Sequence, residues 1–250
     1  MELQKKKWDR NEKEWGDFSD TYQSILENTA IQSSMILYSI TRAKDYSKLC
    51  EVGVGCGLAS RMFVSNIMKN STVYCASDIA DGMNQKYKEG FTSADVSLNP
   101  KVKYQWVGEE ESLDISKLAS GLGVKFNKMV LHLKADNESL PYSDGTFDCY
   151  LSSLSLNLVN DHKKMLAESF RVLENGGVAG FTVLGRIENC NYATFLPEVA
   201  KSLGHDHTHD TDIKHPAHLG DKESLVKDIK DAGFTSVKTY YTKTNIIFES

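Results

Sequence analysis

The sequence predicts an α/β fold: a doubly wound, mostly parallel sheet of seven strands with helices on both faces. Three observations lead to this prediction. Short apolar segments alternate with segments of helical spacing, the first apolar segment runs into a glycine-rich turn, and the last two strand-like segments are separated by a few residues. Alternation of strands and helices favours parallel strands. The short final link permits a hairpin, so we expect an antiparallel strand at the C-terminal edge.

The N-terminal part of the chain is expected to form a helical lid. Apolar residues recur at nearly helical spacing over 29–43, which predicts a helix packed on the following domain. An aromatic-rich segment precedes it and contains Tyr22, a candidate lid residue that could equally belong to the core. The segment 48–54 is then typical of a buried strand, and its glycines lead into a helix over 58–68.

The remaining elements continue this order. Further strands are predicted where short apolar runs occur, at 72–77, 128–133, 147–152 and 178–184. Helices are predicted over 81–89, 161–173 and 222–232. Gly176 and Gly177 are expected to close the second of these helices, since glycine adopts positive φ readily. The hairpin strands are predicted at 235–241 and 245–249, and the segment 91–127 is an insertion whose structure the pattern does not define.

Composition and length exclude several classes of protein. The 250 residues suit a single domain, with an N-terminal lid (1–46), a core (47–185) and a C-terminal part (186–250). The net charge of −5 opposes binding to phosphate backbones, so we expect no nucleic acid partner. No apolar stretch approaches the roughly 20 residues of a membrane span. The charged N-terminus also lacks the apolar region of a secretory signal, so we expect a cytoplasmic protein.

Cysteine and histidine provide no recognisable metal site. The five cysteines are scattered without a CxxC pair, which indicates reduced, mostly buried thiols. Five of the seven histidines lie between His205 and His218. This cluster has three interpretations: a metal site, a loop that contacts substrate, or a solvated polar loop. No four-ligand spacing is recognisable there, so we expect no metal.

A glycine loop and a later acid have the form of a nucleotide site. Glu51-Val52-Gly53-Val54-Gly55-Cys56-Gly57 follows the first predicted strand, and its glycines let backbone approach a ligand closely. Leu58 stands where a dinucleotide fingerprint has its third glycine, and no GK[ST] follows, so a pyrophosphate is less favoured. Asp78, 21 residues beyond Gly57, ends the next strand and is placed to accept the ribose hydroxyls of an adenosine. Its alternative role is to cap a helix.

At these motifs the sequence resembles the class I S-adenosylmethionine-dependent methyltransferases, and within them the ubiquinone/menaquinone-biosynthesis-like group (methyltransferase type 11). The glycine loop matches ExGxGxG, and Asp78 matches the ribose-binding acid. Asp136-Asn137-Glu138-Ser139-Leu140-Pro141-Tyr142, followed by Phe147-Asp148, looks like DAExLPFxDxxFD, and Phe170-Arg171-Val172-Leu173-Glu174-Asn175-Gly176-Gly177 is similar to the RVLKPGG turn. Two departures are a longer interval between Asp78 and Asp136 and Asn175 in place of the customary proline.

The resemblance implies a cofactor, a reaction and a set of binding residues. The cofactor is S-adenosylmethionine, and the reaction is in-line methyl transfer to a small-molecule or lipid acceptor, in which positioning is the main task. The implied cofactor-binding residues are Glu51, Gly53, Gly55, Gly57, Asp78, Ile79, Met83, Asp136, Asn137, Ser152 and Tyr22. Glu51 would lie near the methionine amino group and Ser152 near the transferred methyl, although structural roles stay open for both.

No catalytic residue is assigned from the sequence. His132 and His162 are the candidates for a general base, and a structural role is the simpler interpretation of each. Two alternatives to a small-molecule or lipid methyltransferase stay open. One is a methyltransferase acting on protein or RNA, which would need a basic or extended docking surface. The other is a non-catalytic module that binds S-adenosylmethionine.

Overall fold

A sheet of parallel strands forms the centre of the computed structural model. The structure describes residues 2–93, 101–119, 125–190, 198–199, 201–204 and 217–244, with side chains from residue 12 onward. Within them six strands lie in the order β3-β4-β2-β1-β5-β6, and all pairs are parallel. The strands are β1 (Lys48–Val52), β2 (Thr72–Asp78), β3 (Val102–Glu109), β4 (Lys128–Lys134), β5 (Phe147–Ser153) and β6 (Leu173–Thr182).

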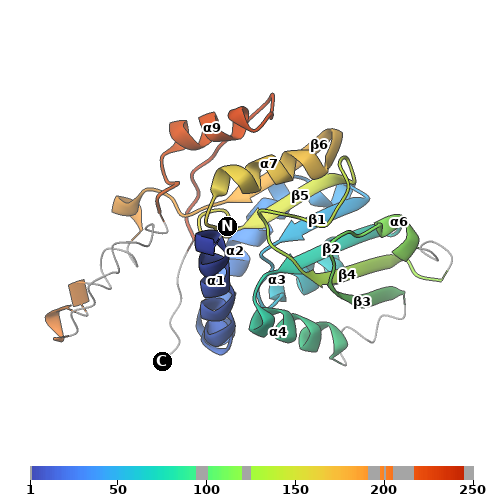
Figure 1. Ribbon diagram of the computed structural model, residues 1–250, viewed down its shortest axis with the longest axis horizontal. Coiled ribbons are helices and arrows are strands. Elements are labelled where there is room, and N and C mark those ends of the chain that lie inside the picture. The colour runs from blue at the N-terminus through green and yellow to red at the C-terminus, as the bar shows by residue number, and fades with distance from the viewer. Residues whose placement is uncertain are drawn as a thin grey trace.

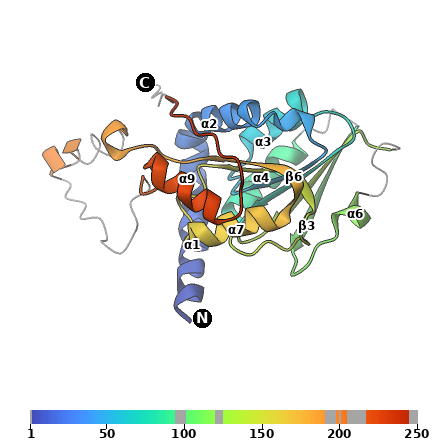
Figure 2. The same cartoon turned by 90° about the horizontal axis from the view of Figure 1, so that it is seen from above.

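Helices cover both faces of this sheet (Figures 1 and 2). One face packs on α2 (Glu27–Ile40), α3 (Leu58–Met62) with its π-helical continuation (Phe63–Ile67), and α4 (Asp81–Thr92). The other packs on α6 (Ile115–Leu118), α7 (His162–Val172) and α9 (Lys222–Asp231). Two 3-10 turns are formed by Ala43–Asp45 and Ile187–Asn189. The prediction of a doubly wound, mostly parallel α/β fold is therefore confirmed.

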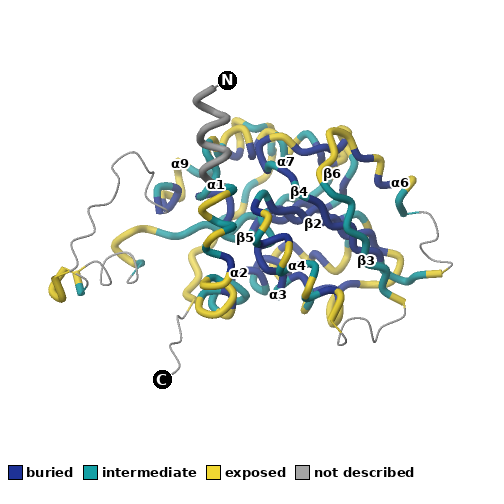
Figure 3. Tube along the Cα trace, turned by 60° about the horizontal axis from the view of Figure 1, so that its bottom comes forward, coloured by how far each residue is buried: buried dark blue, intermediate teal, exposed yellow. Residues whose placement is uncertain are grey.

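The apolar core follows the alternation of side chains along each strand. Leu49 and Cys149 face one helix layer, whereas Cys50 and Tyr150 face the other. All seven residues of β2 are buried, and Figure 3 shows buried chain running along β2 and β4. Strands buried on both faces carry nearly continuous apolar sequence, which made them recognisable from the sequence.

The N-terminal helices lie against the ends of the strands near α4. α1 (Glu2–Thr21) contacts α4 and passes through a π-helical turn (Tyr22–Leu26) into α2. Lys134 at the end of β4 forms ion pairs with Glu12 of α1 and Asp81 of α4. These contacts fasten α1 to the core and place the π-helical turn beside the carboxyl end of β1.

The C-terminal hairpin prediction is not confirmed. Residues 235–244 form no strand, and the second predicted strand, 245–249, lies outside the described residues. Phe234 and Val237 pack against the core cluster, and the hydroxyl of Tyr241 donates to the carbonyl of Gly220 at 3.3 Å. These contacts hold the segment against the core, but strand-like alternation in the sequence does not by itself supply a neighbouring strand. The expected seventh, antiparallel strand is absent from the described sheet.

The structure defines one segment that the sequence left open, around β3, and corrects one prediction, at the start of β6. The segment 91–127, left unassigned from the sequence, contains β3 at the edge of the sheet and α6. Gly176 does not close α7, because that helix ends at Val172 and β6 begins at the next residue. Gly176, with φ of +84°, instead lies between Leu173 and Val178, where the β5–β6 register shifts.

The described part of the chain contains neither a membrane-spanning helix nor a metal-binding cluster of side chains. None of its helices combines the length and the apolar character that crossing a bilayer requires. It contains no group of three or more His, Cys, Asp or Glu side chains that could hold a metal ion. Within the histidine cluster, residues 205–216 lie outside the described ranges, and His218 packs against His162 with ring centroids 5.9 Å apart.

Candidate functional site: the glycine loop and its lid

The glycine loop connects β1 to α3 through backbone that L-residues rarely adopt. Gly53 and Gly57 have φ of +64° and +87°. A Cβ at Gly53 would lie 2.3 Å from Ser155 Oγ, and one at Gly57 would lie 2.4 Å from the ring of Tyr87. Glycine is therefore needed at both positions, for the backbone conformation and for the close approach of neighbouring side chains.

Asp78 joins this loop at the end of β2. Its Oδ2 accepts a hydrogen bond from the backbone N–H of Gly55 at 2.9 Å, and its Oδ1 accepts from Ala80 at 3.0 Å. Burial raises the pKa of Asp78, while these N–H donors oppose the rise. The N-cap of α4 is Ala80 and it has no side-chain cap bond, so the interpretation of Asp78 as the cap of that helix is wrong. The predicted meeting of the glycine loop with this carboxylate is present in the structure.

Glu51 lies beneath the loop and connects three elements. Its buried carboxylate accepts hydrogen bonds from the hydroxyl of Tyr38 in α2, at 2.8 Å, and from the hydroxyl of Tyr74 in β2. Burial raises the pKa of Glu51 to about 7, although both hydroxyls act to lower it. The carboxylate also borders the cavity beside the loop. Its proposed contact with an amino group stays a prediction.

Asp136, Asn137 and Ser152 come from the loops and strand beside β1. Asn137 Nδ2 donates to Ser155 Oγ at 2.9 Å, and its buried Oδ1 has no hydrogen-bond partner among the described residues. Asp136 Oδ1 accepts from the N–H of Glu138 and shapes the turn. Ser152 is fully buried in β5, and of these two neighbouring serines it is Ser153 that lines the cavity.

Tyr22, Ile79 and Met83 belong to one small apolar cluster. Met83 is buried with Cys56 and Ala80, and Trp15, Tyr22 and Ile79 pack against them. The ring of Tyr22 lies over the glycine loop, since a Cβ at Gly55 would be 3.2 Å from it. The structure therefore gathers these three residues around Cys56 of the loop: one from the π-helical turn, one directly after β2 and one from α4.

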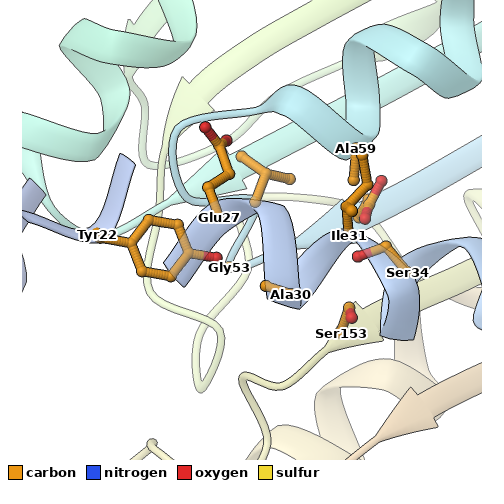
Figure 4. A pocket seen from close by; sticks show the side chains of 10 residues that line it. Tyr22, Glu27, Ala30, Ile31, Ser34, Gly53, Ala59 and Ser153 are labelled. Carbon is orange, nitrogen blue, oxygen red and sulfur yellow. The ribbon is translucent and has the colours of Figure 1, made fainter. Parts of the chain in front are cut away.

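A cavity lies between this lid and the carboxyl ends of β1 and β5 (Figure 4). Its walls include Tyr22, Glu27 and Ser34 from the lid and Gly53 and Ser153 from the sheet side. The cavity has a volume of about 20 Å³, enough for about one water molecule.

Glu27 is a cavity residue that the sequence did not reveal. Its buried Oε1 accepts a hydrogen bond of 2.8 Å from the N–H of Leu58, the first residue of α3. Burial raises the pKa of Glu27, and the Leu58 N–H and nearby Arg61 oppose this. Glu27 precedes the helix predicted over 29–43, and glutamate is normally exposed, so no local pattern distinguished it.

The parallel sheet, the glycine loop after its first central strand and the acid after the next define an α/β protein with a nucleotide-type site. A family model described as "Methyltransferase domain" matches residues 50–181, more than half of the chain. The chain belongs to this methyltransferase domain family.

Curated relatives share part of the chain. A ubiquinone/menaquinone biosynthesis C-methyltransferase UbiE from Pasteurella multocida is 31% identical over 135 residues, which cover 50% of each protein. A mitochondrial 2-methoxy-6-polyprenyl-1,4-benzoquinol methylase from Leishmania donovani is 30% identical over 113 residues, covering 42% of this chain and 39% of the relative. The chain thus spans half or less of the length of these two relatives.

Solved structures confirm the fold at low sequence identity. A complex of the Haloferax volcanii Trm112 methyltransferase activator with its methyltransferase gives a TM-score of 0.56 at 16% identity, covering 88% of this chain and 76% of the other. The [4+2]-cyclase SpnF gives 0.50 at 16% identity, covering 81% and 56%. One neighbour is thus named for methylation and another for cyclisation, so the fold does not define the reaction.

Proposed function

We propose that this protein is an enzyme that transfers the methyl group of S-adenosylmethionine to a small-molecule or lipid acceptor. The observation that carries the proposal is the hydrogen bond between Gly55 and Asp78, which joins the glycine loop to the acid at the end of β2. Family membership supports the same activity.

The residues around the loop fit this cofactor. Each carboxylate oxygen of Asp78 accepts one N–H bond and keeps capacity for another, as two ribose hydroxyls require. The unpartnered Oδ1 of Asn137 is an acceptor beside Gly53, suited to an adenine amino group. Ile79 and Met83 supply apolar surface next to Asp78. We propose that these residues, together with Glu51, Gly53, Gly57, Asp136, Ser152 and Tyr22, hold the cofactor.

The chemistry requires mainly orientation and exclusion of water. When bound, the cofactor supplies a methyl group already activated by its sulfonium. The glycine loop and Asp78 would hold it at the ends of β1 and β2, and Tyr22 would close over it. Alignment of two reactants can contribute on the order of 7–11 kcal/mol. We assign no general base, because His132 is occupied in hydrogen bonds on both ring nitrogens.

A quinol is the first acceptor to test, because the curated relatives are named for methylation of benzoquinols and quinones. A protein or RNA acceptor is less favoured by the net charge of −5. We also propose a cytoplasmic location, which is supported by the absence of disulfides at the four buried cysteines, Cys50, Cys56, Cys75 and Cys149. The domain division proposed above, with 1–46 as the lid, is consistent with this function.

The test combines binding and turnover. The purified chain is titrated with S-adenosylhomocysteine by calorimetry and then incubated with methyl-labelled S-adenosylmethionine, a benzoquinol and, separately, a metabolite extract. Binding together with labelled small-molecule or lipid product supports the proposal. Binding without transfer would indicate a non-catalytic module, transfer only to protein or RNA would indicate the alternative acceptor, and absence of binding would refute the cofactor.

A further inference from the structure

A series of hydrogen-bonded polar side chains lies behind Asp78: the buried Asn84 and His132 and the half-buried Tyr104. Asn84, on α4, donates from Nδ2 to the backbone carbonyl of Asp78 at 3.1 Å. Its Oδ1 lies 2.8 Å from His132 Nε2 on β4. His132 Nδ1 in turn lies 2.9 Å from the hydroxyl of Tyr104 on β3. This series of hydrogen bonds links β3, β4 and α4 to the residue at the end of β2.

The hydrogen bonds from Tyr104 through His132 and Asn84 to Asp78 all run in one direction, each group donating to the next. Asn84 Oδ1 can only accept, so His132 carries its hydrogen on Nε2 and accepts from Tyr104 on Nδ1. Burial lowers the pKa of His132 to about 3, and nearby Lys88 acts in the same sense. The imidazole is therefore neutral near pH 7, and the order of donors and acceptors is fixed.

An apolar residue would satisfy the packing at position 132. His132 is fully buried on the same side of β4 as Val130, and its ring centroid lies 4.0 Å from that of Tyr87. Burying an imidazole and an amide is costly unless each polar atom has a partner. Here the polar atoms of His132 and of the Asn84 amide all have partners, and the last donor, Asn84 Nδ2, is directed at the carbonyl of Asp78.

Asp78 is thus fixed through both its backbone and its side chain. Its carbonyl accepts from Asn84 and from the N–H of Ala135, at 3.2 Å, while its carboxylate accepts from Gly55 and Ala80. We propose that Asn84 and His132 are positioning residues that hold Asp78 in the orientation needed to bind the ribose of the cofactor. This inference rests on the proposed function, and neither residue contacts the cofactor itself.

The test measures discrimination for the ribose hydroxyl. Calorimetry gives the Kd of the full chain for S-adenosylhomocysteine and for its 2′-deoxy analogue, and the ratio of the two values reports the Asp78 contact. Asn84→Ala is expected to weaken S-adenosylhomocysteine binding by about tenfold and to bring the ratio towards one. In an Asp78→Ala background the same substitution should have little further effect. Asn66→Ala, at an exposed helix asparagine, is the matched control.

The outcomes separate this inference from the proposed function. Equal weakening of both ligands by Asn84→Ala, or no weakening, would show a merely structural role and overturn the inference. If Asn84→Ala does not fold, Tyr104→Phe carries the test, because it removes only the terminal hydroxyl and keeps the ring stacked on Phe91. An unchanged ratio in that variant would then overturn the inference. A wild-type chain that binds neither ligand would contradict the proposed function first.

Discussion

The N–H of Gly55 and the carboxylate of Asp78 are 2.9 Å apart, although the residues are 23 positions apart in the sequence. The bond is buried and joins the turn after β1 to the end of β2. It makes the shape of the glycine loop and the direction of the carboxylate depend on each other. A substitution at either residue should therefore alter the conformation of the other.

Asp78→Ala is expected to weaken binding of S-adenosylhomocysteine by about tenfold or more. The substitution removes the ribose acceptor and also leaves the N–H groups of Gly55 and Ala80 without their partner. Calorimetry measures the affinity, and Asp231→Ala, at an exposed residue of α9, is the control. Unchanged affinity in Asp78→Ala would remove this residue from the site.

Two glycine substitutions separate backbone strain from steric conflict. Gly57→Ala and Gly176→Ala both place alanine at positive φ, of +87° and +84°. At Gly176 the added Cβ meets nothing within 4 Å, so we expect a loss of about 1–2 kcal/mol in the free energy of unfolding. At Gly57 the Cβ meets the ring of Tyr87, which should add about 1–3 kcal/mol. Urea unfolding measures both; equal losses would mean that Tyr87 moves aside without cost.

The sequence was sufficient for the parts of the site that local backbone chemistry dictates. Gly53 and Gly57 need positive φ, which favours glycine. A carboxylate at the end of a short apolar run can be recognised from the sequence alone. The central strands are buried on both faces, so their composition alone marks them. These features depend little on what packs beside them.

Other features depend on partners that are distant in the chain. β3 is a half-buried edge strand, interrupted by a register shift at Gly108, so its pattern lacks the continuous apolar run of β2. Residues 235–241 have strand-like alternation but no paired neighbour in the described chain. Glu27 becomes recognisable only when the lid places it against Leu58. Such tertiary contacts leave no periodic signal.

Glu51→Gln should remove a pH dependence of stability. The pKa of Glu51 is raised from 4.5 to about 7 by burial, so the folded chain holds this proton more tightly than the unfolded chain. The wild-type free energy of unfolding therefore falls as pH rises from about 4.5 to 7, by up to about 3 kcal/mol from this group. Glutamine still accepts hydrogen bonds from Tyr38 and Tyr74 but does not ionise.

The measurement is urea unfolding of wild type and variant from pH 5 to 8. Because other buried acids titrate in both proteins, the relevant quantity is the difference between the two free energies, which should grow in favour of Glu51→Gln as pH rises. Glu223→Gln, at an exposed position in the first turn of α9, should show no such trend. A difference that does not vary with pH would mean that Glu51 titrates normally.

Tyr22→Ala is expected to accelerate both entry and release of the cofactor. The ring of Tyr22 lies over Gly55, and the cavity beside it holds about one water molecule, so we expect the ring to move aside before a ligand enters. Removing the ring lowers that barrier and also removes apolar contact from the bound state. The dissociation rate should rise by up to about tenfold, since full burial of a large apolar side chain contributes roughly 1.5–3 kcal/mol and Tyr22 is half-buried.

Stopped-flow binding of S-adenosylhomocysteine separates the two rates. Tyr22→Phe keeps the ring and its edge contact with Trp15, so both of its rates should stay close to wild type. Tyr240→Ala, at a residue that is 69% exposed, controls for the loss of a tyrosine elsewhere. If Tyr22→Ala raises only the dissociation rate, Tyr22 is a contact residue and not a gate, because removing a gate must also raise the association rate.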